Sequence, residues 1–328
     1  MNILVTGGAG YIGSHTVQRL REAQHEVVIF DNLSSGHRDA VRDFTLVVGD
    51  LANKDDVEKV FSENAFDAVV HFAGSTEAGE SMTDPRRFFD DNLVCGLNLL
   101  EIMLKHDVKQ IVFSSSAAVY GAPEQMPIEE TVPKNPTNVY GLTKWMFEQI
   151  LSAYDHAYGL RSVSLRYFNA AGADPSGAIG EHHSKETHLI PLALFAALSK
   201  RDTIQIFGTD YPTPDGTCVR DYVHVSDLAD AHVLALDYLQ KNNISDAFNL
   251  GNEKGVSVRA VIEAAKKITG VDFAVREEPR RTGDPAELTA SSSKAKAVLG
   301  WHPRFDTVEQ IIETAWQWHK NHPDGFES

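Results

Sequence analysis

The chain of 328 residues has only two cysteines, Cys95 and Cys218, which is too few for a framework of disulfides. Reduced thiols are therefore expected, and they favour a cytoplasmic location. The chain also lacks an excess of positive charge, because 46 acidic residues outnumber 30 basic ones and the formal net charge is −16. This charge repels nucleic acids and anionic membranes, so neither is expected as a partner.

Long apolar runs are absent as well. The longest, residues 189–198, is too short to span a bilayer and contains Pro191. The first residues have the pattern of a strand that runs into glycines, so no targeting signal is expected there. The content of 42% hydrophobic and 23% charged residues is typical of a globular protein and excludes a disordered or collagen-like chain.

Short apolar segments alternate with helical ones up to about Arg166. Strands are predicted at residues 2–5, 26–30, 45–48, 68–72, 110–114 and 162–165. Helices are predicted between them, at residues 12–24, 54–64, 85–105 and 139–158. The strands are apolar throughout, as in a parallel sheet covered on both faces. The expected fold class is therefore α/β, with a doubly wound parallel sheet of the Rossmann type.

The alternation of strands and helices becomes less regular after Phe168, where residues 169–187 are predicted to form a long irregular segment. Further helices are predicted at residues 188–200, 227–241, 258–269, 293–299 and 307–319, with strands at residues 204–207 and 247–250. We expect residues 1–168 to form the first domain, of the Rossmann type. Residues 169–328 would mainly form a smaller C-terminal α/β substrate domain, with some later segments returning to the first domain.

A glycine-rich turn, with Gly7, Gly10 and Gly13, follows the first strand and opens the first helix. Glycine lets a pyrophosphate approach the backbone N–H groups and the positive end of the helix. Glycines of this kind also occur in ordinary turns, so the order of strand, glycines and helix carries the dinucleotide interpretation. Asp31 ends the second strand, where a carboxylate can bind a ribose diol. A 2′-phosphate ~4 Å from that carboxylate would cost roughly 4 kcal/mol per charge, which favours NAD over NADP.

Tyr140 and Lys144 are four residues apart on a predicted helix, so their side chains project to the same side. A cation ~6 Å from a phenol is worth roughly 2.8 kcal/mol, about two pKa units. Lys144, together with a positively charged nicotinamide, is therefore expected to bring the pKa of Tyr140 toward neutrality, where a general base works best. Residues 114–116 are serines that end the fifth strand, where a hydroxyl can contact the substrate oxygen. Each motif also has a purely structural interpretation. Tyr140 and Lys144 could be a pair on the protein surface, and the serines could form a loop or a helix cap.

Together these motifs resemble the extended short-chain dehydrogenase/reductase family over essentially the whole chain. The matching stretches are residues 7–13, 31–33, 71–74, 113–116, 119–121, 140–144 and 166–169, and in the substrate region residues 207–213, 215–225 and 281–284. Among family members the resemblance is strongest to those that interconvert UDP-glucose and UDP-galactose at C4 in galactose metabolism. It implies that Tyr140 deprotonates the sugar's 4-hydroxyl with help from Ser116, while NAD accepts and returns the hydride through a 4-keto sugar. Lys144 would hold the cofactor ribose and keep Tyr140 acidic.

The resemblance also implies the remaining site residues. The cofactor NAD would be bound by Gly7, Gly10, Tyr11, Ile12, Gly13, Asp31, Asn32, Ser35, Asp50, Leu51, Phe72, Ala73, Gly74, Asn92, Ser114, Tyr140, Lys144, Tyr167 and Phe168. The UDP-hexose would be bound by Ser116, Tyr140, Asn169, His188, Leu189, Phe207, Arg220, Tyr222, Arg281, Asp284 and Leu288. Relatives use the helices at residues 85–105 and 139–158 to dimerise, so a homodimer is expected.

Two departures from the family pattern bear on specificity. Residues 75–77 read Ser-Thr-Glu where many members carry a lysine, which puts one phosphate contact in doubt. Leu288 stands where some members carry a bulky tyrosine near the sugar's 2-substituent. Because leucine is smaller, N-acetylated UDP-hexosamines are expected to be accepted as well.

Three alternatives remain open: another nucleotide-sugar epimerase, a nucleotide-sugar dehydratase, and a catalytically silent NAD-binding protein. The dehydratase reaction needs a carboxylic acid pair where this chain has Ala117 and Ala118. Metal-binding side chains occur at residues 181–183 and at His188. Adjacent histidines in a loop rarely point at one ion, and the spacing does not match a zinc motif, so no metal site is expected.

Overall fold

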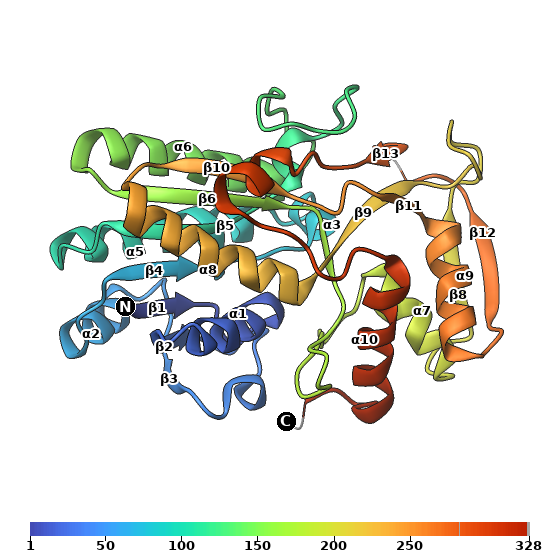
Figure 1. The fold of residues 1–328 in the computed structure, drawn as a ribbon, viewed down its shortest axis with the longest axis horizontal. Helices are drawn as coiled ribbons and strands as arrows, with labels where there is room; N and C mark the ends of the chain where they lie inside the picture. Colours follow the sequence, from blue (N-terminus) through green and yellow to red (C-terminus); the bar gives the residue numbers. More distant parts are fainter. Residues whose placement is uncertain (282, 327–328) are drawn as a thin grey trace.

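The computed structural model describes residues 1–281 and 283–326, and one parallel sheet of seven strands dominates it (Figure 1). Thr282, within the predicted substrate segment 281–284, and residues 327–328 lie outside the described residues. The strands run in the order β10-β6-β5-β4-β1-β2-β3. Their bounds are Asn2–Thr6 (β1), Glu26–Asp31 (β2), Thr45–Val48 (β3), Ala68–His71 (β4), Gln110–Ser116 (β5), Arg161–Tyr167 (β6) and Asp246–Leu250 (β10).

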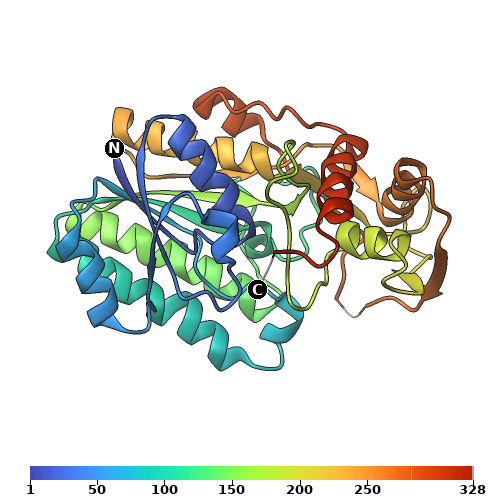
Figure 2. The ribbon, with the colours of Figure 1, turned by 90° about the horizontal axis from the view of Figure 1, so that it is seen from below.

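Helices cover both faces of this sheet, as Figure 2 shows from below. On one face, α1 and α8 bury apolar side chains such as Val17, Leu20 and Leu236 against the strands. On the other face, α2, α5 and α6 pack through Val57, Leu99 and Phe147. These helices are Tyr11–Glu22 (α1), Lys54–Glu63 (α2), Cys95–Lys105 (α5), Val139–Tyr158 (α6) and Val225–Asn242 (α8). Burial on both faces explains why the strands are apolar throughout.

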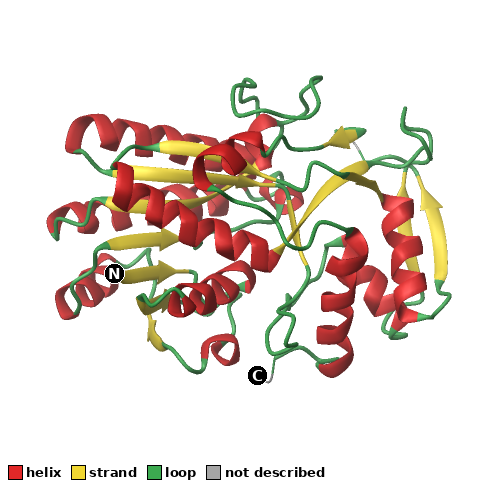
Figure 3. Ribbon diagram, viewed as in Figure 1, coloured by secondary structure: helices red, strands yellow, loops and turns green. Residues whose placement is uncertain are grey.

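A smaller region with its own strands and helices lies beyond the carboxyl ends of the sheet (Figure 3). Strand β9 pairs with β7, β11 and β13, and β8 pairs in parallel with β12. A separate apolar cluster joins the helices α7, α9 and α10 of this region. The strands are Asn169–Ala171 (β7), Thr203–Phe207 (β8), Val219–His224 (β9), Gly255–Ser257 (β11), Ala274–Glu278 (β12) and Glu287–Leu288 (β13); the helices are Leu189–Ala197 (α7), Val258–Thr269 (α9) and Val308–Asn321 (α10).

The predicted fold class is confirmed, and the differences lie in short or composite elements. The helix predicted at residues 85–105 consists of α4 (Pro85–Phe89), a π-helical segment η2 (Asp90–Val94) and α5. The short helices α3 (Ala78–Ser81), η1 (Arg38–Val41) and η3 (Ala117–Tyr120) were not predicted, and Ala295–Leu299 is a π-helical turn, η4. The strands β7, β9, β11, β12 and β13 were also missed, because several are only two or three residues long and β9 mixes charged with apolar residues.

Within residues 1–281 and 283–326, none of the helices combines the length and the apolar character that crossing a lipid bilayer requires.

Candidate active site

The glycine-rich turn between β1 and α1 forms a cradle that has no room for side chains. A Cβ added at Gly7, whose φ is +71°, would lie 2.5 Å from the backbone nitrogen of Ala73. A Cβ added at Gly13 would lie 2.3 Å from the carbonyl oxygen of Gly7. Gly10 caps α1 without a side-chain hydrogen bond, and the first turn of the helix contains no acidic residue. The positive end of α1 is therefore open to an anionic group such as a pyrophosphate.

Asp31, the last residue of β2, is held beside this turn. One carboxylate oxygen accepts the backbone N–H of Ala9 at 2.9 Å, and the other accepts that of Leu33 at 2.8 Å. Burial raises the pKa of Asp31, while these two hydrogen bonds act to lower it. Each carboxylate oxygen keeps a further lone pair, so the residue can also accept hydrogen bonds from a ribose diol. The structure of this edge thus fits a dinucleotide.

The other predicted cofactor residues lie along the same edge of the sheet. Some of them follow β2, β3 or β4, and others lie in β5 or at the end of β6. Asn92 lies in η2. Asn92 accepts the N–H of Ser75 at 2.7 Å and donates to the hydroxyl of Thr143 at 2.9 Å, so it joins the strand end to α6. The carboxyl ends of parallel strands form the ligand crevice of a doubly wound fold. The assignment of these residues to the cofactor stays a proposal.

Tyr140 and Lys144 lie in the first two turns of α6, directly behind the end of β5. The side chain of Asn138 caps the helix by accepting the N–H of Gly141 at 2.8 Å. The Lys144 Nζ donates to the carbonyl oxygen of Ser114 at 3.0 Å and lies 5.8 Å from the centre of the Tyr140 ring. The phenol and the ammonium group therefore lie side by side, as their spacing predicts.

The chain by itself does not lower the pKa of Tyr140. Burial raises the pKa of Tyr140 above its usual value, and the charge of Glu77 raises it further, while a hydrogen bond with Ser116 acts to lower it. Burial also lowers the pKa of Lys144 to about 8. The chain alone therefore does not meet the expectation that Lys144 draws the pKa of Tyr140 toward neutrality, because burial is the largest influence on that pKa and raises it.

Two further hydroxyl groups surround Tyr140. Ser116 ends β5, and its hydroxyl accepts the N–H of Ala118 at 3.1 Å, which fixes the hydroxyl at the start of η3. Tyr167 ends β6 and shares a hydrogen bond with Ser114. Burial raises the pKa of Tyr167, and the charge of the nearby Tyr140 raises it further. The site therefore contains a tyrosine, a lysine and a serine at one strand end, which suits proton transfer to or from an alcohol.

A cavity of about 360 Å³ is lined by residues of β7, α7, β8 and β9 and of the segments beside them in the smaller region. Its lining includes every predicted substrate-binding residue except Ser116, Tyr140 and Leu288: Asn169, His188, Leu189, Phe207, Arg220, Tyr222, Arg281 and Asp284. The chain passes directly from β6, which ends beside Tyr140, into β7, which begins with Asn169. The first residue of the cavity wall, Asn169, thus follows Tyr167 by two positions along the chain.

Two guanidinium groups, those of Arg220 and Arg281, line this cavity together with the carboxylates of Glu186 and Asp284. Arg220 donates to the carbonyl oxygens of Val219 and Pro285 and pairs with Asp284, so its position is fixed from three sides. Arg281 stacks over the ring of Phe207, with 4.0 Å between the guanidinium carbon and the ring centre. Guanidinium groups bind diphosphate oxygens with two parallel hydrogen bonds. The ion pair considered as the structural alternative for Arg220 is present, and it orients the guanidinium within the cavity wall.

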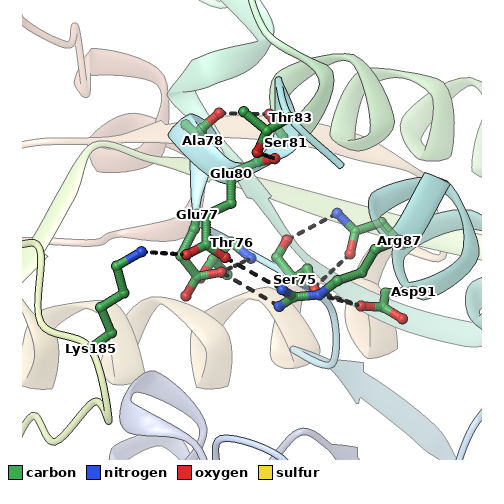
Figure 4. A network of polar contacts seen from close by, with 11 residues as sticks. Ser75, Thr76, Glu77, Ala78, Glu80, Ser81, Thr83, Arg87, Asp91 and Lys185 are labelled. Carbon is green, nitrogen blue, oxygen red and sulfur yellow. Dashed lines mark hydrogen bonds and ion pairs between the residues drawn. The ribbon is translucent and has the colours of Figure 1, made fainter. Parts of the chain in front are cut away.

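Residues 75–77, where the chain departs from the family pattern, belong to a network of charged groups (Figure 4). Arg87 bonds or pairs with Glu77, Glu80 and Asp91, and Lys185 reaches Glu80 at 2.8 Å from a different segment. Glu77 is acidic and pairs with Arg87 in this network, so it does not take over the phosphate contact of a lysine. The network ties the segment around Lys185 to the helix α3.

Several residues that shape the site were not predicted from the sequence. Glu148 and Arg166 form a buried ion pair between α6 and β6, and Asp221 accepts three backbone N–H groups from residues 252, 253 and 290. Glu186 and Cys218 line the cavity. Their partners lie far away along the chain, so no local motif marks them.

Residues 3–251 match the model of the NAD dependent epimerase/dehydratase family, and the chain belongs to this family. It is 53% identical over 330 residues to a UDP-glucose 4-epimerase of Streptococcus mutans serotype c, covering 100% of this chain and 99% of that protein. A crystal structure of a UDP-glucose 4-epimerase shares 47% identity with a TM-score of 0.98, and all of both chains is covered. The UDP-glucose 4-epimerase of Bifidobacterium longum in complex with NAD+ and UDP is 39% identical with a TM-score of 0.94, covering 99% of this chain and 100% of that chain.

Proposed function

We propose that this protein is an enzyme that interconverts UDP-glucose and UDP-galactose by inverting the configuration at C4. The observation that carries the proposal is the position of Tyr140, Lys144 and Ser116 at one strand end, beside a cavity with two fixed guanidinium groups. Relatives with about half of their residues identical are UDP-glucose 4-epimerases, and one solved relative holds NAD+ and UDP. Bound at the glycine-rich edge, NAD would supply the hydride acceptor and donor for C4.

The residues of the chain perform the proton transfer. Tyr140 accepts the proton of the sugar's 4-hydroxyl and returns it after inversion, and Ser116 holds the same oxygen by a hydrogen bond. Because burial alone raises the pKa of Tyr140, the positive charges of Lys144 and of a bound nicotinamide are needed to make the phenol a base. Inversion also needs the hexose to turn within the site, so the nucleotide must be held more firmly than the sugar. Arg220 and Arg281 would provide that hold on the diphosphate.

The proposal is tested by proton NMR of the purified protein with UDP-galactose and no added cofactor. We expect the signals of UDP-glucose to appear, because tightly held NAD is recycled within each turnover. A requirement for stoichiometric NAD, with accumulation of NADH, would instead indicate a dehydrogenase. Ala117 and Ala118 cannot act as the acid pair of a dehydratase, so a 6-deoxy product is not expected.

Leu288 is expected to let the site accept N-acetylated substrates. It packs against the apolar cluster that contains Phe168, near the end of β6, and pairs through its backbone with Arg220. We expect the protein to epimerise UDP-N-acetylglucosamine, and we expect Leu288→Tyr to reduce kcat/KM for that substrate by about 10–200-fold, the range for steric discrimination in an apolar pocket. Activity on UDP-galactose should change far less. Wild-type protein that turns over UDP-galactose but not UDP-N-acetylglucosamine would end this part of the proposal.

A homodimer is proposed on the exposed apolar residues of α5, η2 and α6. These are Val94, Leu97, Leu142 and Met146, which are 48%, 38%, 37% and 39% exposed. Their spacing places the residues of each pair on one face of its helix. We expect sedimentation velocity to show a dimer, and we expect Met146→Arg to shift it to a monomer. Ile244→Arg is the matched control, because Ile244 is 57% exposed but follows α8, away from these helices. A monomeric wild type would contradict the proposal.

Residues 1–168 would form the NAD-binding part and residues 169–328 mainly the nucleotide-sugar part. The strand β10, which joins the large sheet beside β6, supports the idea that later segments return to the first part. A cytoplasmic location belongs to the same proposal, and the two free, buried cysteines support it.

A further inference from the structure

Four side chains of one segment converge on a single point beside the cavity. They are Glu181, His183, Glu186 and His188, and one ligand atom from each lies within 4.8 Å of all the others. The Nδ1 of His183 is 3.4 Å from Glu181 and 3.1 Å from Glu186, and the Nδ1 of His188 is 2.6 Å and 3.2 Å from the same two carboxylates. The two imidazoles thus alternate with the two carboxylates around one centre.

These separations can be compared with the edges of a tetrahedral metal site. Metal–ligand bonds of about 2.0–2.1 Å in tetrahedral geometry place neighbouring ligand atoms roughly 3.4 Å apart. The four nitrogen–oxygen separations extend from hydrogen-bond length, 2.6 Å, up to 3.4 Å, and the two histidines approach different oxygens of Glu186. An ion at the centre would therefore need only small side-chain movements.

The surroundings hold the four ligands in place. The carboxylates of Glu181 and Glu186 are only 3% and 5% exposed, and the imidazoles of His183 and His188 lie against both of them. The indole N–H of Trp318 donates to the carbonyl oxygen of Glu181 at 3.1 Å, and Lys185 bonds Glu80 of α3 (Figure 4). The segment is thus fixed from α10 on one side and from α3 on the other.

Glu181, His183 and His188 are named from the sequence but Glu186 is not, and the neighbouring histidine shows how the side chains of this segment divide. His182 turns away and stacks on the ring of His37 at 4.5 Å, so the adjacent histidines do point in different directions. Glu186 supplies the fourth ligand, and its spacing of three residues from His183 and two from His188 matches no familiar zinc motif. The expectation that no metal binds rested on the two adjacent histidines, of which only His183 faces the cluster.

We infer that Glu181, His183, Glu186 and His188 form a four-coordinate site for one divalent transition-metal ion of the Zn²⁺ class. Imidazole nitrogens with carboxylate oxygens suit such ions, whereas Mg²⁺ and Ca²⁺ prefer ligand sets made of oxygen. Four protein ligands leave no open position, so the ion has a structural role. It fixes the segment that brings Glu186 and His188 into the wall of the cavity.

The test uses the full-length protein, stripped with a chelator and then titrated with ZnCl₂ alone. We expect one tightly bound zinc per chain by calorimetry and by elemental analysis after gel filtration, and a rise in melting temperature on adding zinc. His183→Ala and the nearly isosteric Glu186→Gln should each lower the zinc affinity at least tenfold and abolish this rise. His182→Ala is the matched control and should keep the zinc.

Substitution with Co²⁺ supplies an independent readout. We expect the visible absorption of tetrahedral cobalt in the wild type and in His182→Ala, and its loss in His183→Ala and Glu186→Gln. Circular dichroism checks that each variant is folded. If His183→Ala does not fold, Glu186→Gln serves as the deciding variant. Wild-type protein with less than a tenth of an equivalent of zinc, or zinc bound equally by wild type and the folded variants, would overturn the inference and leave only histidine–glutamate ion pairs.

Discussion

Replacing Tyr140 with phenylalanine is expected to lower kcat for UDP-galactose by about 10²–10⁴-fold, the usual contribution of a positioned acid–base group. The substitution removes the one oxygen that can accept the 4-hydroxyl proton beside Ser116, and it leaves the aromatic ring in place. The amount of NAD released from the purified variant by acid should stay the same, because the glycine-rich turn and Asp31 are untouched.

Tyr158→Phe provides the matched control for that experiment. Tyr158 lies at the far end of the same helix and is 54% exposed, so its hydroxyl has no role in the site. It should keep nearly full activity. If Tyr140→Phe kept kcat within about threefold of the wild type, another group would have to be the base. Loss of both activity and NAD would show a structural effect instead.

Replacing Glu148 with alanine is expected to lower the free energy of unfolding by about 3–5 kcal/mol, the cost of leaving one partner of a buried ion pair alone. Arg166 holds this carboxylate with its Nη2 at 2.6 Å and its Nε at 3.0 Å, and the two side chains are only 6% and 5% exposed. Ser115 donates to the same carboxylate at 2.5 Å. The pair joins α6, which carries Tyr140 and Lys144, to β5 and β6. Urea unfolding measures the change.

Two further variants distinguish the loss of this buried ion pair from the loss of an exposed one. Asp90→Ala breaks the exposed pair of Arg86 and Asp90 and should cost less than about 1 kcal/mol. The double variant Glu148→Leu with Arg166→Met replaces both charges with apolar groups, so it should be more stable than Glu148→Ala alone. A cost below about 1 kcal/mol for Glu148→Ala would contradict the view that this pair secures the catalytic helix.

The large sheet could be predicted from the sequence because its signals are local. Six of its strands are short apolar segments, and the helices between them have clear starts, such as Asn138 before α6. Burial on both faces gives each strand the same composition, so the parallel class follows as well. Strands such as β13, two residues long, gave no such signal, because a tertiary partner rather than the segment itself makes them strands.

The adjacency of Tyr140 and Lys144 could be predicted for the same reason, since they are one helical turn apart. The shift in the pKa of Tyr140 could not be predicted in this way. The pKa of Tyr140 depends on burial and on Glu77, which is 63 positions away and reaches the site only in the folded chain. The Glu148–Arg166 pair likewise depends on the packing of α6 against β5 and β6.

The central claim is that the hydrogen on C4 leaves and returns within the closed site, while Tyr140 handles only the hydroxyl proton. The most direct test is turnover of UDP-galactose that carries deuterium at C4, in ordinary water, followed by NMR and mass spectrometry of the UDP-glucose formed. We predict that the product retains the deuterium at C4. Product with hydrogen from the solvent at C4 would show exchange of that hydrogen with water and would contradict the account.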